Sequence, residues 1–250
     1  MARIKPKAED RILRRQPKRR KRSGFWRRLR WIALLLVLVV AITPVALAGL
    51  YKHVAPPVTP LMVIRFFQGE GLKKNWTPLS RMSPHVVRAV IGLEDSRFCN
   101  HGGIDWDSVG DALSDHLKGG RLRGASTISM QTAKNLFLWP DQHFLRKALE
   151  APLTYMIEGV LGKRRILEIY LNIVELGPGI YGVEAASQIY FKRPARALTP
   201  WQAGLLAAIL PSPRKWSPIR PTDYIRDRAR TSMARAELLR GSLQCTGVRG

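Results

Sequence analysis

The sequence predicts a mainly α-helical protein with one transmembrane helix near its N-terminus. Residues 31–51 contain no charged side chain, which is typical of a membrane span. Most segments after residue 83 place apolar residues at the three- and four-residue spacing of helices. Strand-like runs are few and short. With 250 residues, the chain has room for one sizeable domain and an appendage.

Residues 1–30 form a strongly basic segment that we expect to be disordered. They hold fourteen Lys and Arg against two acidic residues, and so carry half of the net charge of +24. Such a segment buries too little apolar surface to fold alone. Because an apolar span follows directly, attraction to anionic lipid is favoured over binding to nucleic acid.

Residues 31–51 have the length of a helix that crosses a bilayer, with Trp31 and Tyr51 at its two interfaces. The basic segment before this span predicts a cytoplasmic N-terminus and places the remaining residues on the outer side. A cleaved signal peptide is the alternative, because Ala46 and Ala48 form a small-x-small pair. The long apolar run favours a retained anchor.

Residues 52–60 predict a stiff, extended linker, because they contain three prolines. Branched and aromatic residues at 61–67, bounded by glycines, predict a short strand. We expect residues 61–220 to form one domain and residues 221–250 a charged terminal helix and tail. Within these segments, helices are predicted at 84–94, 105–118, 126–138, 144–160, 163–174, 200–210 and 226–240.

Two cysteines, Cys99 and Cys245, are present. Two cysteines far apart in sequence define neither a disulfide framework nor a metal site, so we expect both to be free. The five histidines show no spacing typical of metal ligands, and Ser126 does not lie in a nucleophile elbow. No metal site is therefore predicted.

The first candidate site is the stretch EDSRFCNHGGID, residues 94–105. Glu94 and Asp95 follow an apolar helix, His101 can form a hydrogen bond back to them, and two glycines permit a tight turn. This arrangement would present a carboxylate in a cleft. A solvated acidic loop is the alternative interpretation of this stretch alone.

The second candidate site is the segment RKALE, residues 146–150. On a helix, Arg146 and Lys147 lie one turn before Glu150, so two cations and a carboxylate share one face. Lys134, on the preceding predicted helix, can add a third cation. An anion clamp beside an acid is the functional interpretation, and an exposed lattice of ion pairs is the alternative.

These segments together resemble the peptidoglycan glycosyltransferases of family 51, and within that family the monofunctional biosynthetic peptidoglycan transglycosylases. The resemblance covers roughly residues 62–218, and five motifs occur in family order. They are carried by Glu94, Asp95, Phe98, His101 and Gly103; Gly124, Ser126, Thr127, Ile128 and Gln131; Arg146, Lys147 and Glu150; Lys163, Ile166, Leu167, Tyr170, Leu171 and Asn172; and Gly177, Gly182, Ala185, Ala186, Tyr190 and Phe191.

The resemblance implies a lysozyme-like, mainly α fold with a small jaw lobe around the helix that begins at Asp105. It implies polymerisation of lipid II into β-1,4 glycan strands with release of undecaprenyl pyrophosphate. It further implies an inner-membrane enzyme with a periplasmic catalytic domain. Its partners would be lipid II, the growing strand, the membrane and proteins of cell division or elongation, but no nucleic acid.

The resemblance also assigns roles to the candidate residues. Glu94 would be the general base that deprotonates the acceptor 4-hydroxyl, and Glu150 would orient the cations that stabilise the leaving pyrophosphate. No cofactor is expected to be required, although a divalent cation, Mg²⁺ or Mn²⁺, would assist the leaving group. The remaining contacts to sugar or pyrophosphate are assigned to Asp95, His101, Ser126, Gln131, Lys134, Arg146 and Lys147.

Three residues depart from the family pattern. Met130 stands where the family usually has glutamine, Gln142 where arginine is common, and Cys99 where an aromatic residue is common. The changes at 130 and 142 predict weaker contacts to substrate. Two other functions stay open: hydrolysis of glycan on a lysozyme-like scaffold, and binding of lipid II by an inactive, membrane-tethered relative.

Overall fold

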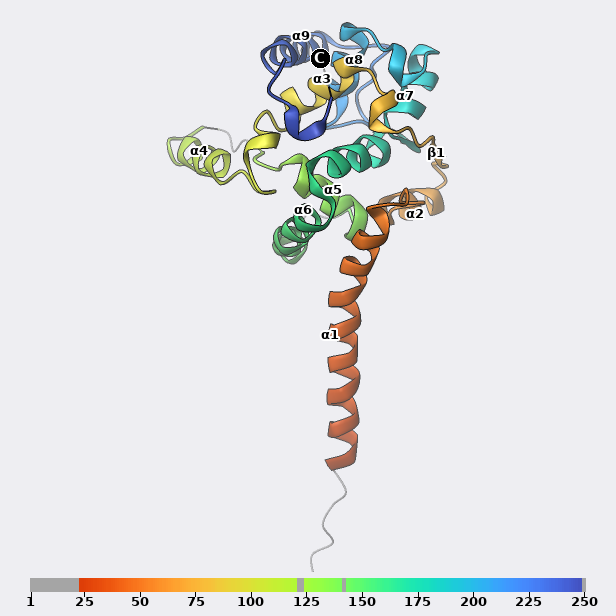
Figure 1. Cartoon of the computed structure of the whole chain (residues 1–250), viewed down its shortest axis with the longest axis vertical. Coiled ribbons are helices and arrows are strands. Elements are labelled where there is room, and N and C mark those ends of the chain that lie inside the picture. The colour runs from red at the N-terminus through yellow and green to blue at the C-terminus, as the bar shows by residue number, and fades with distance from the viewer. Residues whose placement is uncertain (1–22, 121–123, 141–142, 249–250) are drawn as a thin grey trace, which may run out of the picture. The chain divides into compact units, whose positions relative to one another are not determined.

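The structure of the protein is a computed structural model that describes residues 23–120, 124–140 and 143–248. The chain divides into two compact units, Met1–Ile42 and Thr43–Gly250. Helix α1 (Ser23–Tyr51) runs through both (Figure 1). The predicted disordered tail lies outside the described residues over 1–22, and it is wrong for residues 23–30, which form the first part of α1.

The described part of the first unit is an apolar helix without a buried core. The segment Gly24–Tyr51 is long and apolar enough to cross a membrane, and only 6% of its most apolar window is buried. Leu34, Leu38 and Ile42 are more than half exposed. This exposure fits the predicted span, because lipid rather than protein would cover these side chains.

The second unit is mainly α-helical, as predicted. Most helices begin at a residue whose side chain caps the first turn, and three of them have proline at the first position. The helices are α2 (Pro60–Phe67), α3 (Pro84–Glu94), α4 (Trp106–Leu117), α5 (Ile128–Phe137), α6 (Phe144–Ile173), α7 (Val183–Phe191), α8 (Pro200–Ile209) and α9 (Asp223–Leu238), with 3₁₀ turns η2 (Leu79–Arg81), η3 (Phe98–Asn100), η4 (Ala195–Ala197) and η5 (Gln244–Thr246).

Helix α6 contains both helices predicted between residues 144 and 174. Gly162 interrupts it with a φ of 71° and a ψ of 162°, a conformation that disfavours residues with a Cβ atom. The predicted break between residues 160 and 163 is therefore confirmed as a kink. Arg146 and Lys147 lie on the first half of α6, and Tyr170 lies on the second half.

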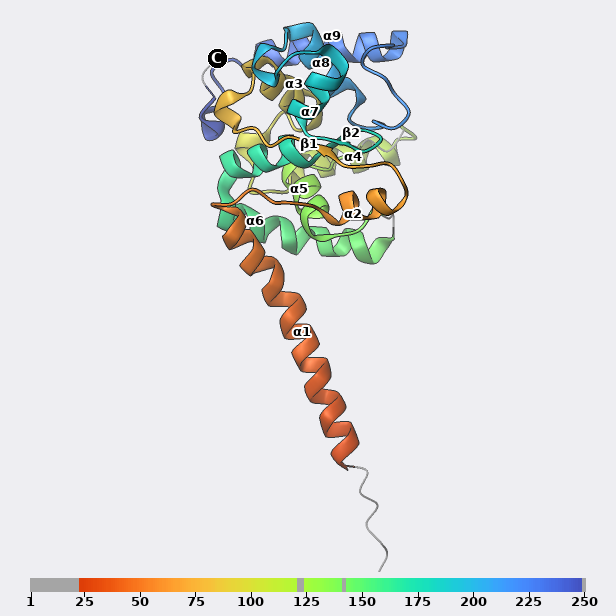
Figure 2. The same cartoon turned by 90° about the vertical axis from the view of Figure 1, so that its right-hand side faces the viewer.

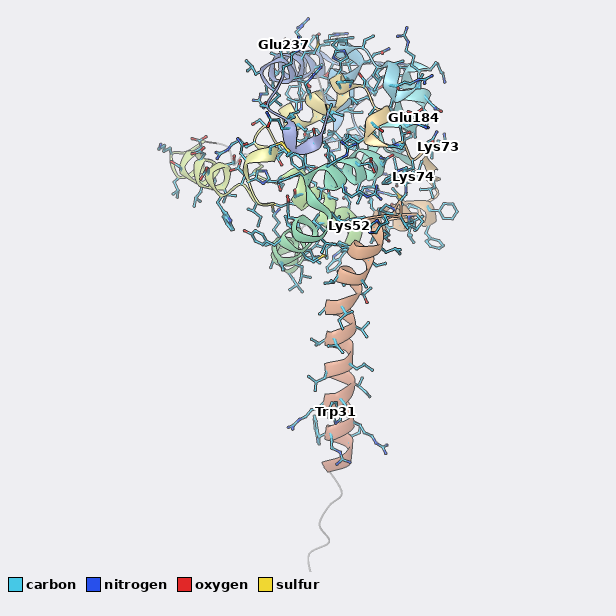
Figure 3. All side chains as sticks on the ribbon, in the orientation of Figure 1. Trp31, Lys52, Lys73, Lys74, Glu184 and Glu237 are labelled. Atoms are coloured by element: carbon cyan, nitrogen blue, oxygen red, sulfur yellow. A yellow bond between two sulfur atoms is a disulfide. The ribbon has the colours of Figure 1, made fainter. Side chains whose placement is uncertain are left out.

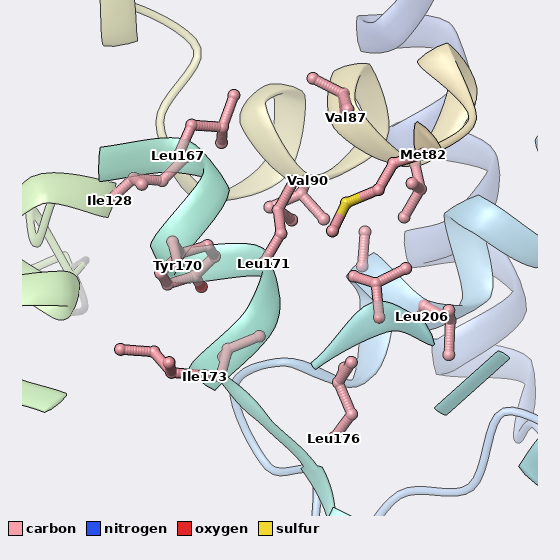
Figure 4. Packing of buried hydrophobic residues seen from close by; sticks show 14 of the residues in the cluster. Met82, Val87, Val90, Ile128, Leu167, Tyr170, Leu171, Ile173, Leu176 and Leu206 are labelled. Atoms are coloured by element: carbon pink, nitrogen blue, oxygen red, sulfur yellow. The ribbon is translucent and has the colours of Figure 1, made fainter. Parts of the chain in front are cut away.

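The helices pack in two groups within this unit. Helices α3, α8 and α9 contact one another at one end of the unit. At the other end, α2 and α6 both contact α5 (Figures 1 and 2). Buried side chains of the second half of α6, among them Tyr170 and Leu171, fill the core between the groups (Figure 4). The core thereby holds α3 and α5, which carry the candidate site, in a fixed relation.

A small sheet of three strands completes the unit. Strand β3 (Ile180–Tyr181) lies between β1 (Lys73–Lys74), to which it is parallel, and β2 (Glu175–Gly177), to which it is antiparallel. Glycine is required at Gly179, because a Cβ atom there would lie 2.0 Å from the carbonyl oxygen of Glu70.

The strand predicted at residues 61–67 is wrong, because this segment forms helix α2. Thr59 caps the helix by accepting a hydrogen bond from the backbone of Met62, and Pro60 occupies the first helical position. Met62 is buried, whereas Phe66 and Phe67 are 56% and 82% exposed. The short apolar run is thus an amphipathic helix whose aromatic side chains face outward.

Helix α4 is the helix predicted from Asp105, whose side chain caps it through the backbone of Ser108. Figure 1 shows α4 at the edge of the second unit. Leu113 and Leu117, predicted at apolar positions, are 54% and 78% exposed. The small lobe expected around α4 stays a prediction, because α4 belongs to the same compact unit as the other helices after residue 43.

The prediction that both cysteines are free is wrong, because Cys99 and Cys245 form a disulfide with their Cα atoms 5.7 Å apart. The C-terminal turn η5 packs against η3 and α6, and Arg164 donates a hydrogen bond to a carbonyl of η5 at 3.0 Å. The two cysteines are 146 residues apart in sequence, so the sequence alone did not indicate that they are close in space.

Candidate active site

Glu94 is the last residue of α3, and its carboxylate has two partners from distant segments. Gln131 of α5 donates a hydrogen bond from Nε2 to Glu94 Oε2 at 2.9 Å. Arg228 of α9 places Nη2 3.4 Å from Glu94 Oε1. Only 12% of the Glu94 side chain is exposed. The solvated-loop interpretation of this glutamate is therefore wrong.

A hydrogen bond from the core determines which end of the Gln131 amide faces Glu94. Tyr170, which is fully buried, donates its hydroxyl proton to Gln131 Oε1 at 3.1 Å. Burial raises the pKa of Tyr170 well above its usual value, so its hydroxyl remains a donor. The Gln131 nitrogen is consequently directed at the carboxylate.

The surroundings of Glu94 change its affinity for protons. Burial raises the pKa of Glu94, while the hydrogen bond from Gln131 and the charge of Arg228 oppose this rise. Asp95 adds to the rise, and Lys134 opposes it. A carboxylate with a raised pKa is suited to accept a proton from a substrate hydroxyl.

Asp95, by contrast, connects the loop after α3 to the start of α5. Its Oδ1 lies 2.9 Å from His101 Nε2, and its Oδ2 accepts a hydrogen bond from the backbone N–H of Ile128 at 2.9 Å. The Nδ1 atom of His101 accepts from the backbone N–H of Gly103 at 3.1 Å, so the ring proton belongs on Nε2. Asp95 and His101 therefore hold the loop in place, and their predicted substrate contacts stay a prediction.

A cavity of about 190 Å³ lies beside Glu94 and Asp95. Its other walls come from the start of α4, from residues 124–127 and from Arg235 of α9. Most of this lining is polar. The cavity can therefore receive a hydroxylated group next to the Glu94 carboxylate.

The second candidate cluster surrounds Glu150 on the first half of α6. Its side chain is 3% exposed and forms ion pairs with the buried Arg146 and with Lys147, whose Nζ lies 2.7 Å from Glu150 Oε2. Lys147 also donates to Ser126 Oγ at 3.1 Å. The carboxylate and Arg146 are buried, so this is not an exposed lattice of ion pairs.

Lys134 of α5 interacts electrostatically with both glutamates. Burial lowers the pKa of Lys134, the charges of Glu150 and Glu94 oppose this, and Arg146 and Lys147 reinforce it. A second cavity, of about 360 Å³, is lined by Lys134, Arg146 and apolar residues that include Leu61 of α2. Two cations thus line a partly apolar space, and Glu94 lines a different cavity.

The structure describes Met130, one of the residues that depart from the family pattern, but not Gln142. Met130 is buried and lines neither cavity, so glutamine at this position would bury an amide without adding a contact there. The expectation that Met130 weakens substrate contact therefore has no support in the geometry. Gln142 lies outside the described residues.

Sequence patterns missed two residues that contact this site. Arg228 lies in a helix with several other arginines, and nothing in the sequence distinguishes it from them. Tyr170 belongs to a recognised motif, but its hydrogen bond to Gln131 depends on the packing of α5 against α6.

A mostly buried glutamate with a raised pKa and a cluster of cations around a second glutamate are suited to group transfer to an acceptor hydroxyl from an anionic leaving group. The transglycosylase family model matches residues 62–237. The chain belongs to the transglycosylase family, whose domain has a lysozyme-like, mainly α fold.

Curated proteins are similar over most of this chain. A biosynthetic peptidoglycan transglycosylase of Rhodospirillum centenum is 55% identical over 80% of this chain and 87% of its own length. Proteins of the same name from Caulobacter vibrioides and Bdellovibrio bacteriovorus are 48% and 47% identical. These matches cover 82% and 84% of this chain, and 89% and 86% of the relatives.

Proposed function

We propose that this protein is a peptidoglycan glycosyltransferase that polymerises lipid II into β-1,4 glycan strands and releases undecaprenyl pyrophosphate during bacterial cell-wall synthesis. The observation that carries the proposal is the cluster of cations around Glu150, of which Arg146 lines one cavity together with Lys134. Glu94 lines a second cavity. The names of the curated relatives support the same reaction.

The geometry supports a direct displacement at the anomeric carbon of the donor. Glu94 accepts the proton of the acceptor 4-hydroxyl while that oxygen attacks C1, and the bond from C1 to the pyrophosphate oxygen breaks. Attack from the face opposite the leaving group converts an α-linked donor into a β-linked product. Pyrophosphate leaves as an anion, so the site needs cations and no acid to protonate it.

The three cations stabilise the charge that develops on the leaving group. Lys134 and Arg146 face the larger cavity, and Glu150 holds Arg146 and Lys147 in position through its two oxygens. Assistance of the leaving group by Mg²⁺ or Mn²⁺ is part of the same proposal.

The same proposal places the protein in the inner membrane. Helix α1 would anchor the chain with its N-terminus in the cytoplasm, and the second unit would act in the periplasm, where lipid II, the growing strand and proteins of cell division or elongation are present. The apolar length of α1 supports an anchor.

Synthesis of glycan from purified lipid II by the full chain tests the proposed function. We expect strands that lengthen with time and that lysozyme digests. Release of sugar from finished glycan, without polymer from lipid II, would instead identify a hydrolase. Binding of lipid II without either product would identify an inactive relative.

The pH dependence of polymerisation should report the titration of Glu94. The base acts as a carboxylate, so the rate falls as pH decreases through its pKa, and burial places this fall at a higher pH than for an ordinary glutamate. Replacing Arg228 with Gln removes a charge that lowers this pKa, so the fall should move to higher pH. The control Arg230→Gln, on an exposed residue of the same helix, should leave the profile unchanged. Equal profiles for both variants would contradict this role of Arg228.

Helix α2 should bring the second unit to the bilayer surface. Val63, Phe66 and Phe67 expose apolar surface, and partial insertion would bring the adjacent cavity to its membrane-bound donor. A chain beginning at Thr43, which keeps the buried Ala48 and Tyr51, should sediment with liposomes. Changing Phe66 and Phe67 to Ser should lower the bound fraction at least about fivefold, since each buried aromatic contributes over 1 kcal/mol. Absence of binding by the unmodified chain would contradict insertion.

A further inference from the structure

A third cavity lies between α3, α8 and α9. It has a volume of about 240 Å³, and none of its lining residues lines either cavity of the candidate active site. Arg88 in its wall precedes Glu94 by six residues on α3, which corresponds to about 9 Å along the helix axis. This cavity is therefore separate from the site of the proposed reaction.

Arg88 lines this cavity, and only 7% of the residue is exposed. None of the residues that the structure describes places a carboxylate within ion-pair distance of it, and its guanidinium nitrogens are not among the buried unpartnered atoms, so they reach the solvent of the cavity. Arginine does not lose its charge at any physiological pH. Because this guanidinium faces the cavity without a paired carboxylate, the cavity is suited to an anion that reaches Arg88.

The other charged groups of the cavity leave one net positive charge. Arg240 pairs with Glu237 at 3.0 Å, and both side chains are about 60% exposed (Figure 3 labels Glu237). Burial, Arg88 and Arg240 lower the pKa of His85 against the opposing charge of Glu237, so the imidazole is neutral at pH 7. Arg88 therefore supplies the charge that remains uncompensated.

Short aliphatic groups form the rest of the wall. Ala89, Pro200, Met233 and Ala236 line the cavity and provide no charge. The volume is below the range of pockets that enclose drug-sized ligands, so the ligand is a small group. A single positive charge matches a monoanion better than a phosphate dianion, and the planar guanidinium fits a carboxylate with two parallel hydrogen bonds.

We propose that this cavity binds a small aliphatic carboxylate, held by Arg88 and flanked by Met233 and Pro200. This chemistry occurs both in a free short-chain acid and at the C-terminus of a peptide. The site is independent of the proposed glycosyl transfer, because Arg88 contacts neither Glu94 nor the Glu150 cluster.

Thermal unfolding of the full chain in detergent tests this site. We expect 100 mM propionate to raise Tm by about 3–6 °C over sodium chloride of equal ionic strength. Arg88→Met should abolish this shift without lowering Tm in sodium chloride, because the uncompensated charge is gone. The control Arg220→Met, at an exposed arginine, should retain the shift. N-acetylglycine, which resembles the C-terminus of a peptide, distinguishes the two sources. If it raises Tm at a lower concentration than propionate does, the ligand is a peptide terminus; otherwise the ligand is a free acid.

Three results would overturn the proposal: no shift beyond that of sodium chloride, an undiminished shift in Arg88→Met, or a larger shift with hydrogen phosphate than with propionate. If Arg88→Met does not fold, Arg240→Gln provides the second variant, because Arg240 is exposed and lines the same cavity. Its half-saturating propionate concentration should rise several-fold, and an unchanged value would equally count against the site.

Discussion

Replacing Glu94 with Gln should abolish polymerisation of lipid II. The amide has nearly the same shape as the carboxylate but cannot accept the proton of the acceptor hydroxyl. A general base contributes about 10²–10⁴-fold to a rate, so kcat should fall by at least two orders of magnitude. The measurement is the initial rate of strand formation from purified lipid II by the full chain.

Folding of the Glu94→Gln variant is the necessary control. Gln131 can still donate to an amide oxygen at this position, and burial of a neutral group removes the desolvation that raises the Glu94 pKa. Tm should therefore not fall. A folded variant that still makes strands at more than a tenth of the normal rate would assign the base to another residue. A folded wild-type chain that makes no strands would contradict the proposed function itself.

Replacing Lys134 with Met should cause the second large loss of activity. Lys134 lines the larger of the two cavities and interacts electrostatically with both glutamates, so we expect its charge to act on the leaving pyrophosphate. Removing one preorganised charge from a developing anion typically costs about 10²–10³-fold in kcat. Methionine keeps the aliphatic part of the side chain and tolerates the partly buried position.

The matched control is Lys215→Met, which removes an exposed lysine from a different segment. It should leave the rate of strand formation within about twofold, as expected for an exposed charge with little interaction energy. An assay of finished glycan should separate the two possible chemistries, because hydrolysis needs no clamp for a phosphate. Equal losses of polymerisation and hydrolysis in Lys134→Met would indicate a structural role for this lysine.

Elements with local determinants could be predicted from the sequence. The starts of α3, α4 and α8 were predicted correctly, because the capping side chain and the first turn are neighbours in sequence. The caps are Ser83, Asp105 and Thr199, and proline follows the first and the third. One start was displaced by a residue, because Thr127 and not Ser126 caps α5.

Features that depend on contacts between distant segments could not be predicted in this way. The run at residues 61–67 suits a strand or a helix, and only burial of Met62 against the rest of the unit distinguishes the two. The motifs identified Glu94 and Glu150, but the partners of Glu94 come from α5 and α9. Likewise, Asp95 binds a backbone N–H, a donor that every residue except proline carries.

The disulfide between Cys99 and Cys245 has a consequence for the order of events during synthesis of the chain. The two residues are 146 positions apart, so at about 5–20 residues per second roughly 7–30 s separate their appearance from the ribosome. Until then, the turn that follows Glu94 and Asp95 lacks its covalent connection to the C-terminal segment. The loop next to Glu94 is therefore among the last parts of the molecule to be linked covalently, after the helices that surround it have been synthesised.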